Sequence, residues 1–326
     1  MVALSALSTL GILLAWWSLR LYRRWETKRL IPHLSHFPNA HSRYADVDGV
    51  RLHYIVAGST GPDLILLHGI GANIYCWRKL IPLMAKRHRV WALDLMGFGL
   101  SDKPAHRTYD AKSQARLIRA FMAKHRIRRA VLMGSSMGAA IATQVAALHP
   151  KKVSHLVLCN PSIEAPVVLD LRRVRMLAPL FHPLVNRFTV AQILKRFIYA
   201  PGAEFTAVDV DVYLKPYVEG NVPLQSFIQS IDILVDKEIW KAAAEIKVPT
   251  LLLWGARDAL IPAKLGSKLK AAFPACSLKI HPSAAHHIQE EVPEWLAEEV
   301  QAFIEISCTP PAEFSAAQQS KGPGSS

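Results

Sequence analysis

The sequence predicts an α/β fold in which a mostly parallel central sheet carries helices on both faces. From Ser42 onward, short β-branched or apolar runs alternate with helical stretches, which is the pattern of a doubly wound sheet. Runs such as "LILL" (64–67) and "VLM" (131–133) are too apolar to expose either side, as expected of central strands covered by helices on both faces. With 326 residues, of which 51% are hydrophobic, the chain can bury a large core.

The individual elements follow from these patterns in chain order. Strands are predicted at 51–58, 63–69, 89–97, 129–136, 154–161, 250–258 and 277–283. Helices are predicted between them at 75–86, 109–126, 137–149, 263–273 and 293–305. The α/β core is therefore expected over residues 42–160 and 246–308.

One interval interrupts the alternation of strands and helices. Residues 161–245 contain amphipathic stretches such as "VLDLRRVRMLAPLF" and "TVAQILKRFIY" without a clear strand. An insertion of this length between two strands is too long for a plain loop, so we expect a helical cap over the site. The last segment, 309–326, is rich in Pro, Ser and Gly and poor in bulky apolar residues, which predicts a disordered tail.

The N-terminus has the composition of a membrane anchor. Residues 2–19 carry no charge, and "RLYRRWETKR" follows at once. About 20 apolar residues in a helix cross the hydrocarbon core of a bilayer, so residues 1–22 suffice for a single transmembrane anchor. Trp16 and Trp17 suit an interface, and the basic flank predicts a cytoplasmic catalytic domain joined by a linker over residues 23–41. A cleaved signal peptide is the alternative, but it would need positive charge before the apolar run and a small-residue cleavage site after it.

The net charge of +14 is unevenly distributed. The interval from Arg78 to Arg129 holds fourteen Lys and Arg residues against three aspartates. Such a basic face attracts an anionic membrane surface or a nucleic acid by the same electrostatics. The apolar N-terminus favours the lipid bilayer as partner, and the basic segment lacks the interleaved aromatic residues of a base-stacking surface, so no nucleic acid partner is expected.

The segment "GSSMG" (134–138) is a candidate nucleophile turn. It fits G-x-S-x-G with Ser136 in the centre, between a predicted strand and a predicted helix. A sharp turn there lifts one side chain above the sheet, and Gly134 and Gly138 flank it because a Cβ would clash. Ser136 is therefore the predicted nucleophile, and Ser135 only fills the strand side of the turn. Short matches of this kind also occur by chance, so the surrounding sequence has to supply the rest of the site.

A serine hydroxyl needs a base to take its proton and a carboxylate to orient that base. In this kind of sheet the chain order is Ser, acid, His. Asp258 follows the strand "TLLLWG" and His286 follows the strand "SLKIH", so the order is correct and both lie at carboxyl ends of strands.

The stretch "LLHGIGA" (66–72) ends another strand in a glycine-rich turn. Backbone N–H groups in such a turn can stabilise a developing oxyanion. By position, the predicted donors are the N–H groups of Ile70, after Gly69, and of Met137, directly after the nucleophile. A His-Gly pair is also ordinary turn chemistry, which is the alternative interpretation.

Five motifs in this order resemble the α/β-hydrolase superfamily. They are "LLHGIGA" (66–72), "DLMGFGLSDKP" (94–104), "GSSMG" (134–138), "GARDALIP" (255–262) and "HHIQEEVPE" (286–294), spread over roughly residues 45–305. Specifically, the chain is similar to capped esterases, monoacylglycerol-type lipases and carbon–carbon bond hydrolases. The resemblance implies Ser136 as nucleophile and Asp258 as acid.

The resemblance also implies a choice between two histidines for the base. The family's usual distance from this histidine to the following Glu-x-Pro-Glu segment, here 291–294, favours His286 over His287. Ala285 departs from the glycine that relatives commonly place before the histidine, and Ala139 stands where many have glycine.

Other polar residues are expected to have supporting roles. His68 is predicted to brace the oxyanion turn, and Asp94 to hold the turn after its strand. Asp232 and Asp236 are backup candidates for the acid. His281, His286 and His287 lack the spacing of a metal site and no Cys or carboxylate set completes them, so no metal is expected. No cofactor is implied, because "GFG" (97–99) lacks the spacing of a nucleotide loop.

The predicted function is therefore a membrane-anchored serine hydrolase of carboxylic esters, with lipid-like acyl esters such as monoacylglycerols as substrates. The resemblance implies that a serine at the elbow disfavours epoxide hydrolases and haloalkane dehalogenases, which use Asp there. Two alternatives remain open: a carbon–carbon bond hydrolase of ring-cleavage dienones, and a catalytically silent membrane interaction protein of the same fold. The sequence does not fix the oligomeric state.

Overall fold

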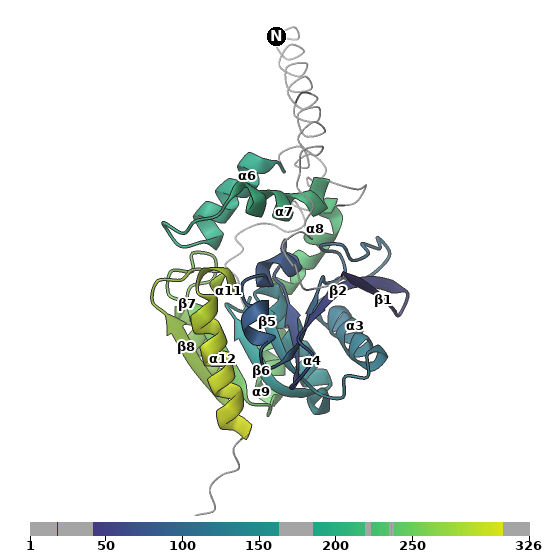
Figure 1. Cartoon of the computed structure of the whole chain (residues 1–326), viewed down its shortest axis with the longest axis vertical. Coiled ribbons are helices and arrows are strands. Elements are labelled where there is room, and N and C mark those ends of the chain that lie inside the picture. The colour runs from purple at the N-terminus through teal and green to yellow at the C-terminus, as the bar shows by residue number, and fades with distance from the viewer. Residues whose placement is uncertain are drawn as a thin grey trace, which may run out of the picture.

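An eight-stranded sheet lies at the centre of the computed structural model, which describes Ser18 and residues 42–162, 185–218, 223–234, 236 and 238–308 (Figure 1). The strand order is β1-β2-β4-β3-β5-β6-β7-β8. The strands are β1 (Arg43–Val47), β2 (Val50–Ala57), β3 (Asp63–Leu67), β4 (Arg89–Leu93), β5 (Ala130–Ser135), β6 (Val153–Cys159), β7 (Thr250–Gly255) and β8 (Cys276–His281). From β4 to β8 all neighbours pair in parallel, whereas β1 and β2 pair antiparallel at one edge. The predicted mostly parallel sheet is confirmed.

The antiparallel edge contains a strand that the sequence analysis did not identify. Strand β1 has three exposed positions out of five, so it lacks the apolar run that marks the central strands. Asp48 and Gly49 join it to β2, and both have positive φ, 48° and 75°. A two-residue hairpin turn needs positive φ at both positions, and Asp-Gly is among the pairs that adopt it most readily.

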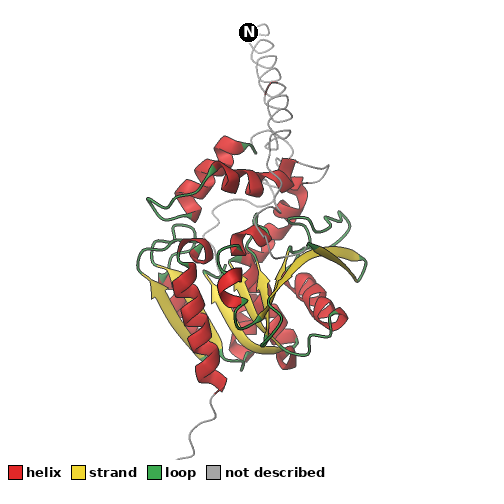
Figure 2. Cartoon of the chain, in the orientation of Figure 1, coloured by secondary structure: helices red, strands yellow, loops and turns green. Residues whose placement is uncertain are grey.

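Two layers of helices cover the sheet, as Figure 2 shows. Alternate side chains of a strand point to opposite faces, so the residues that pack with each helix show which face it covers. Ile65 and Leu67 belong to a buried cluster with residues of α3 (Ala111–Lys124), α4 (Met137–Leu148), α9 (Glu238–Glu245) and α10 (Lys264–Ala272). Leu64 and Leu66 belong to a second cluster with η2 (Ile74–Trp77), α2 (Ile81–Met84), α11 (Ile288–Glu291) and α12 (Pro293–Cys308). The near-continuous apolar sequence of β3 therefore serves two cores.

The predicted helix at 75–86 is wrong as a single element. The chain forms the short 3-10 turn η2 and then the short helix α2, with Pro82 in the first turn of α2. Proline has no N–H and its ring clashes with the carbonyl four residues earlier, so a continuous helix across this position is disfavoured. The break leaves Arg78 directly after η2, at the end of the sheet where the site lies.

The interval between β6 and β7 is helical in its described part. It contains α6 (Arg187–Ile193), the π-helical turn η5 (Leu194–Ile198), α7 (Ala207–Val218) and α8 (Pro223–Leu234), followed by α9. α6, η5 and α7 lie beyond the carboxyl ends of the strands, whereas α9 packs against α4 (Figure 1). Asn73 after β3 donates to the Val212 carbonyl at 3.2 Å, and Ser226 donates to the Gly97 carbonyl after β4 at 2.7 Å, which fixes the helices to this end of the sheet.

Several predicted segments lie outside the described residues. These are the anchor over 1–22 apart from Ser18, the linker over 23–41, the part of the cap at 163–184 and the tail over 309–326. Across the described ranges, no helix has both the length and the hydropathy to span a bilayer.

Candidate active site

Ser136 occupies a strained turn between β5 and α4. Its φ of 53° and ψ of −117° are unusual for a residue with a side chain. A Cβ built on Gly134 would lie 2.3 Å from the Gly138 carbonyl oxygen, and one built on Gly138 would lie 2.1 Å from the Leu67 carbonyl oxygen. No Cβ fits at such distances, so both glycines are required for the turn. The Ser136 N–H donates to the Cys159 carbonyl at 2.9 Å, which ties the turn to β6.

The two adjacent serines have different surroundings. The Ser135 hydroxyl donates to Gln289 Oε1 at 3.5 Å, so it faces helix α11 rather than the head of the sheet. Ser136 stands on the other side of the turn, beside Gly69: a Cβ on Gly69 would lie 3.8 Å from Ser136 Oγ. Ser136 therefore lies next to the glycine-rich turn after β3.

The two residues predicted to supply oxyanion donors are chain neighbours of Gly69 and Ser136. Ile70 directly follows Gly69, and Met137 is the first residue of α4. The first N–H groups of an α-helix have no acceptor inside the helix, and they lie at the positive end of its dipole. Developing negative charge beside Ser136 would meet this helix terminus.

His68 braces the glycine turn, as predicted. It is fully buried, its Nε2 accepts a hydrogen bond from the Leu95 N–H at 3.0 Å, and its Nδ1 lies 2.7 Å from the Gly69 carbonyl. Since Nε2 accepts, Nδ1 carries the proton and donates to Gly69. Burial lowers the pKa of His68, which keeps the ring neutral in this tautomer.

Asp258 and His286 form a buried hydrogen-bonded pair. His286 Nδ1 lies 2.8 Å from Asp258 Oδ2, and the two residues are 2% and 5% exposed. Burial by itself would raise the pKa of Asp258, but the nearby His286 and the hydrogen bonds that the carboxylate accepts outweigh it and lower the pKa. A carboxylate that stays ionised fixes the proton on Nδ1 and leaves Nε2 available as a base.

Asn160 supports this pair and was not identified from the sequence. Its side-chain nitrogen donates to Asp258 Oδ2 at 2.6 Å and to the Ala285 carbonyl at 3.2 Å. Its φ is 44°, a conformation that asparagine adopts more readily than most residues. The signal in the sequence is an asparagine directly after β6, at the carboxyl end of a strand next to β5.

The alternative candidates have other partners. His287 Nδ1 lies 3.0 Å from Glu290 Oε1, so it does not share the Asp258 carboxylate with its neighbour. Asp258 occupies the Nδ1 side of His286 that Asp232 or Asp236 would have to approach. In the part of the chain that the structure describes, no group of three or more His, Cys, Asp or Glu side chains is placed to hold a metal ion.

Comparison with known proteins identifies the family. A family model described as alpha/beta hydrolase fold matches residues 62–197. Haloalkane dehalogenase 2 of Mycobacterium tuberculosis is 30% identical over 267 residues, which cover 78% of this chain and 92% of that protein. The chain belongs to the α/β-hydrolase family.

Other α/β-hydrolases that resemble the chain differ in their named activities. The pimeloyl-[acyl-carrier protein] methyl ester esterase of Pectobacterium carotovorum is 27% identical and aligns with 78% of this chain and 98% of its own length. A solved structure described as a membrane phospholipase A has a TM-score of 0.71 and 26% identity, and the match covers 95% of this chain and 97% of that one. The protein is thus a hydrolase by family, related to esterases, dehalogenases and a membrane phospholipase, and only its own site can narrow the reaction.

Proposed function

We propose that this α/β-hydrolase is a serine hydrolase of carboxylic esters. The carrying observation is the buried 2.8 Å pair of His286 and Asp258, in a chain whose strained elbow bears Ser136. Nε2 of His286 removes the hydroxyl proton as Ser136 attacks the ester carbonyl. The N–H groups of Ile70 and Met137 stabilise the oxyanion, and His286 then protonates the leaving alcohol. Water activated by the same histidine then hydrolyses the acyl-enzyme, which releases the carboxylic acid and restores Ser136.

The residue at the elbow separates this reaction from that of the dehalogenase relative. Dehalogenases and epoxide hydrolases of the superfamily are expected to carry Asp at the elbow, whereas this chain has Ser136. A carboxylate that displaces a leaving group from an alkyl carbon forms an ester, which water can cleave at the carbonyl, whereas a serine in the same reaction would form an ether that water does not cleave. A serine that attacks an ester carbonyl expels the alcohol and forms an acyl ester, which water does cleave. Ser136 therefore favours the esterase reaction of the other relatives.

The proposed substrate is a lipid-like acyl ester, such as a monoacylglycerol, that reaches the site from a bilayer. Three features support it: the uncharged run 2–19 with its basic flank, the helices between β6 and β7, and the likeness to a membrane phospholipase A over 95% of the chain. We propose that residues 1–22 anchor the protein and that the basic segment 78–129 faces the membrane, with the catalytic domain on the cytoplasmic side.

The test is hydrolysis of p-nitrophenyl esters of increasing acyl length by the full chain in detergent, alongside Ser136→Ala. Ser135→Ala is the matched control, since its hydroxyl faces Gln289. We expect activity with an optimum chain length, lost in Ser136→Ala and kept in Ser135→Ala. Activity on a vinylogous diketone and on no ester would instead favour the carbon–carbon hydrolase, and a folded protein inactive on both would favour the silent scaffold.

A further inference from the structure

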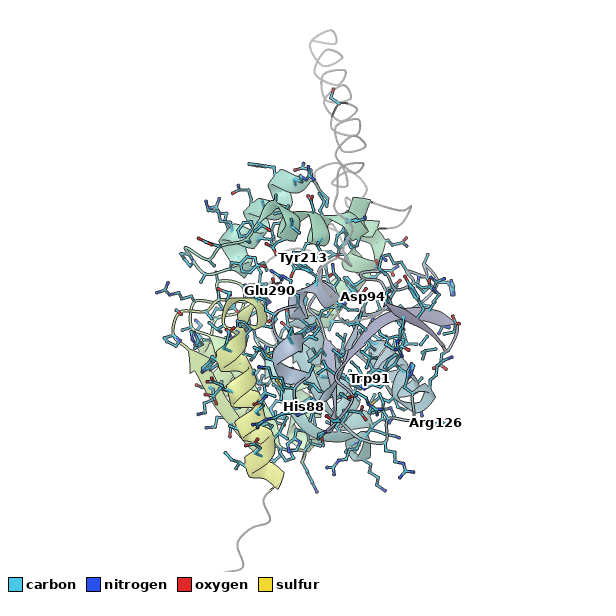
Figure 3. The ribbon with its side chains drawn as sticks, in the orientation of Figure 1. His88, Trp91, Asp94, Arg126, Tyr213 and Glu290 are labelled. Carbon is cyan, nitrogen blue, oxygen red and sulfur yellow. The ribbon has the colours of Figure 1, made fainter. Side chains whose placement is uncertain are left out.

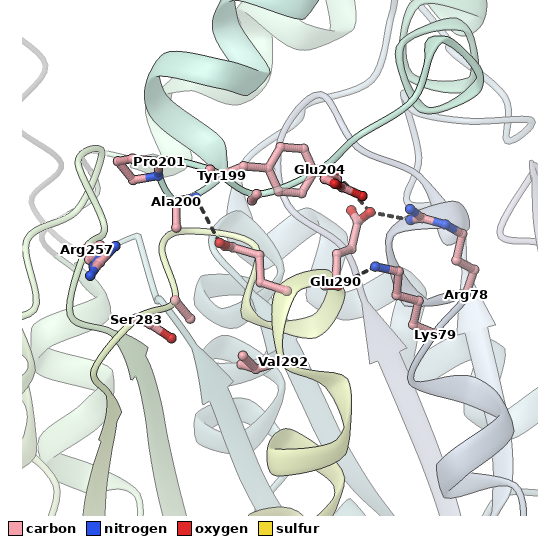
Figure 4. Close-up of a pocket in the computed structure, with 14 residues that line it drawn as sticks. Arg78, Lys79, Tyr199, Ala200, Pro201, Glu204, Arg257, Ser283, Glu290 and Val292 are labelled. Atoms are coloured by element: carbon pink, nitrogen blue, oxygen red, sulfur yellow. Dashed lines mark hydrogen bonds and ion pairs between the residues drawn. The ribbon is translucent and has the colours of Figure 1, made fainter.

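Glu290, in α11, is a second buried carboxylate. It lies directly after the loop 284–287, which carries His286 and His287 and is called the histidine loop below. Glu290 is 1% exposed, and its oxygens accept four hydrogen bonds: from Arg78, Tyr213, Tyr199 at 2.9 Å and His287 at 3.0 Å. Figure 3 labels Glu290 and Tyr213, and Figure 4 shows Glu290 with Arg78 and Tyr199. These donors come from four places: the core turn after η2, helix α7, the residue after η5, and the histidine loop itself. A two-oxygen carboxylate with four donors has its acceptor positions filled.

Burial and neighbouring charges shift the pKa of Glu290 and of its two tyrosine donors. Burial would raise the pKa of Glu290, but the hydrogen bond and charge of His287, then Arg78 and Tyr213, lower it to about 2. Burial, followed by the nearby Glu290 charge, raises the pKa of Tyr199 and of Tyr213. Glu290 therefore stays ionised, and both tyrosines keep the protons that they donate.

Arg78 adds a second contact between the cluster and helix α7. Its Nη2 donates to Asp209 Oδ1 at 2.6 Å, and the Tyr75 hydroxyl donates to the same oxygen at 2.8 Å. The Arg78 side chain is only 15% exposed, so this cation is turned inward and does not add to the basic surface. One guanidinium thus bridges Glu290 of α11 and Asp209 of α7.

Hydrogen bonds from the backbone also join the segment 198–200 to the histidine loop, next to His286 and Asp258. The Ile198 carbonyl, the last of η5, accepts from the N–H groups of both His286 and His287, at 3.0 and 3.3 Å. The Ala200 N–H donates to Glu291 Oε2 at 2.8 Å. A dashed line at the labelled Ala200 marks this bond in Figure 4. A cavity of about 390 Å³ lies beside these contacts and is lined in part by Ala200 and Glu291, so no other protein atoms pack against them on that side. The histidine loop is thus held by segment 198–200 as well as by the sheet.

We propose that Glu290 is a positioning residue that couples docking of the helices between β6 and β7 to the alignment of His286. The carboxylate touches no reacting atom. It holds Tyr199 and Tyr213 against the loop, and this keeps the Ile198 carbonyl on the His286 N–H. When these helices lift, His286 loses that bond and its orientation toward Ser136. The inference rests on the proposed role of His286 as base.

Hydrogen exchange tests the coupling without any substrate. The probe is the full chain with Tyr199→Phe and Tyr213→Phe combined, which removes two donors while keeping both rings. We expect amide exchange to rise about tenfold in the segment 284–291 and in α7 together, because bonds to a charged acceptor are lost. Exchange that rises in α7 while 284–291 stays protected would overturn the coupling.

Asp211→Asn is the matched control. Asp211 accepts two bonds from Arg187, at 2.5 and 2.7 Å, so it joins α6 to α7 without reaching the histidine loop. Its loss should raise exchange in α6 and α7 and leave 284–291 protected. If exchange of 284–291 rose as much in Asp211→Asn as in the double tyrosine variant, the cluster would contribute only to general stability. This outcome would also overturn the proposal.

Kinetics then separates this proposal from the proposed function. With active sites counted by a phosphonate, we expect the double tyrosine variant to lower kcat per site about tenfold at unchanged KM, since misplacing a catalytic group slows chemistry more than binding. Unchanged kcat per site would overturn the positioning role. A wild-type chain without ester activity would refute the proposed function, whereas the exchange result would still decide whether Glu290 couples the two regions.

Discussion

Two carboxylates bind two neighbouring histidines, and their other partners differ. Asp258 accepts from His286, Asn160 and the N–H groups after β7, all within the α/β core. Glu290 accepts from His287 and from residues on both sides of the junction between the core and the helices above it. Two buried carboxylates with similar hydrogen bonds therefore have different roles: Asp258 fixes the proton of one imidazole, whereas Glu290 joins two parts of the molecule.

Alanine at each histidine separates the two regions most strongly. We expect His286→Ala to reduce kcat by roughly 10⁶-fold, the scale seen when a triad base is removed. His287→Ala should reduce it about tenfold, because it removes one donor to Glu290 and leaves the base in place. Ester hydrolysis by the purified variants measures both, and the reverse order would make His287 the base.

Neutralising each carboxylate gives the next largest contrast. Asp258→Asn should lower kcat by about 10⁴-fold, because an amide can hold His286 in the wrong tautomer. Glu290→Gln should lower it only about 10- to 100-fold, through the position of the loop. Steady-state kinetics at neutral pH tests the pair. A large loss in Asp232→Asn or Asp236→Asn with little loss in Asp258→Asn would transfer the acid role.

Asn160 tests how far the core region depends on its support. Asn160→Gly removes the 2.6 Å bond to Asp258 while tolerating the positive φ, so we expect kcat/KM to fall roughly 10- to 100-fold, as for loss of a hydrogen bond to a charged group. Asn160→Ala should lose the same activity and also stability, since alanine is strained at this φ. Thermal unfolding alongside the kinetics distinguishes the two, and full activity in Asn160→Gly would remove Asn160 from the site.

Acid stability provides the smallest contrast. The pKa of Glu290 falls from 4.5 to about 2 on folding, so its contribution is fully present above pH 4.5 and is lost as pH falls toward 2. Between these values the unfolded chain binds one more proton at this group, which steepens the fall of unfolding free energy by about 1.4 kcal/mol per pH unit. Denaturant unfolding should show this extra slope in the wild type and not in Glu290→Gln. Equal slopes would mean that Glu290 is not held as an ion.

The sequence signals that point to Ser136, Asp258 and His286 are local ones. Gly134, Ser136 and Gly138 are spaced by backbone clashes that any chain with this turn must avoid. Asp258 follows the buried apolar strand β7, and His286 follows its partly exposed neighbour β8; the parallel pairing of the two strands brings their carboxyl ends together. Pro82, by contrast, was overlooked within an apolar periodic stretch, so the helix at 75–86 was predicted too long.

The cluster around Glu290 could not be predicted, because the residues that form it are far apart in sequence. Arg78 and Glu290 are separated by 212 positions, and Arg78 counted only as part of a basic stretch. Tyr199 and Tyr213 fit ordinary amphipathic helices. Their convergence depends on how the helices between β6 and β7 dock on the core, which no local pattern specifies. Ile198 contributes through its carbonyl, a group that every residue has.

Covalent labelling with a serine-directed fluorophosphonate would identify the nucleophile, which we expect to be Ser136. The full chain, Ser136→Ala and Ser135→Ala would each be treated at neutral pH and digested, and the adduct located by mass spectrometry. We expect one adduct, on Ser136, in the wild type and in Ser135→Ala, and none in Ser136→Ala. An adduct on another residue, or none on the folded wild-type protein, would contradict this expectation.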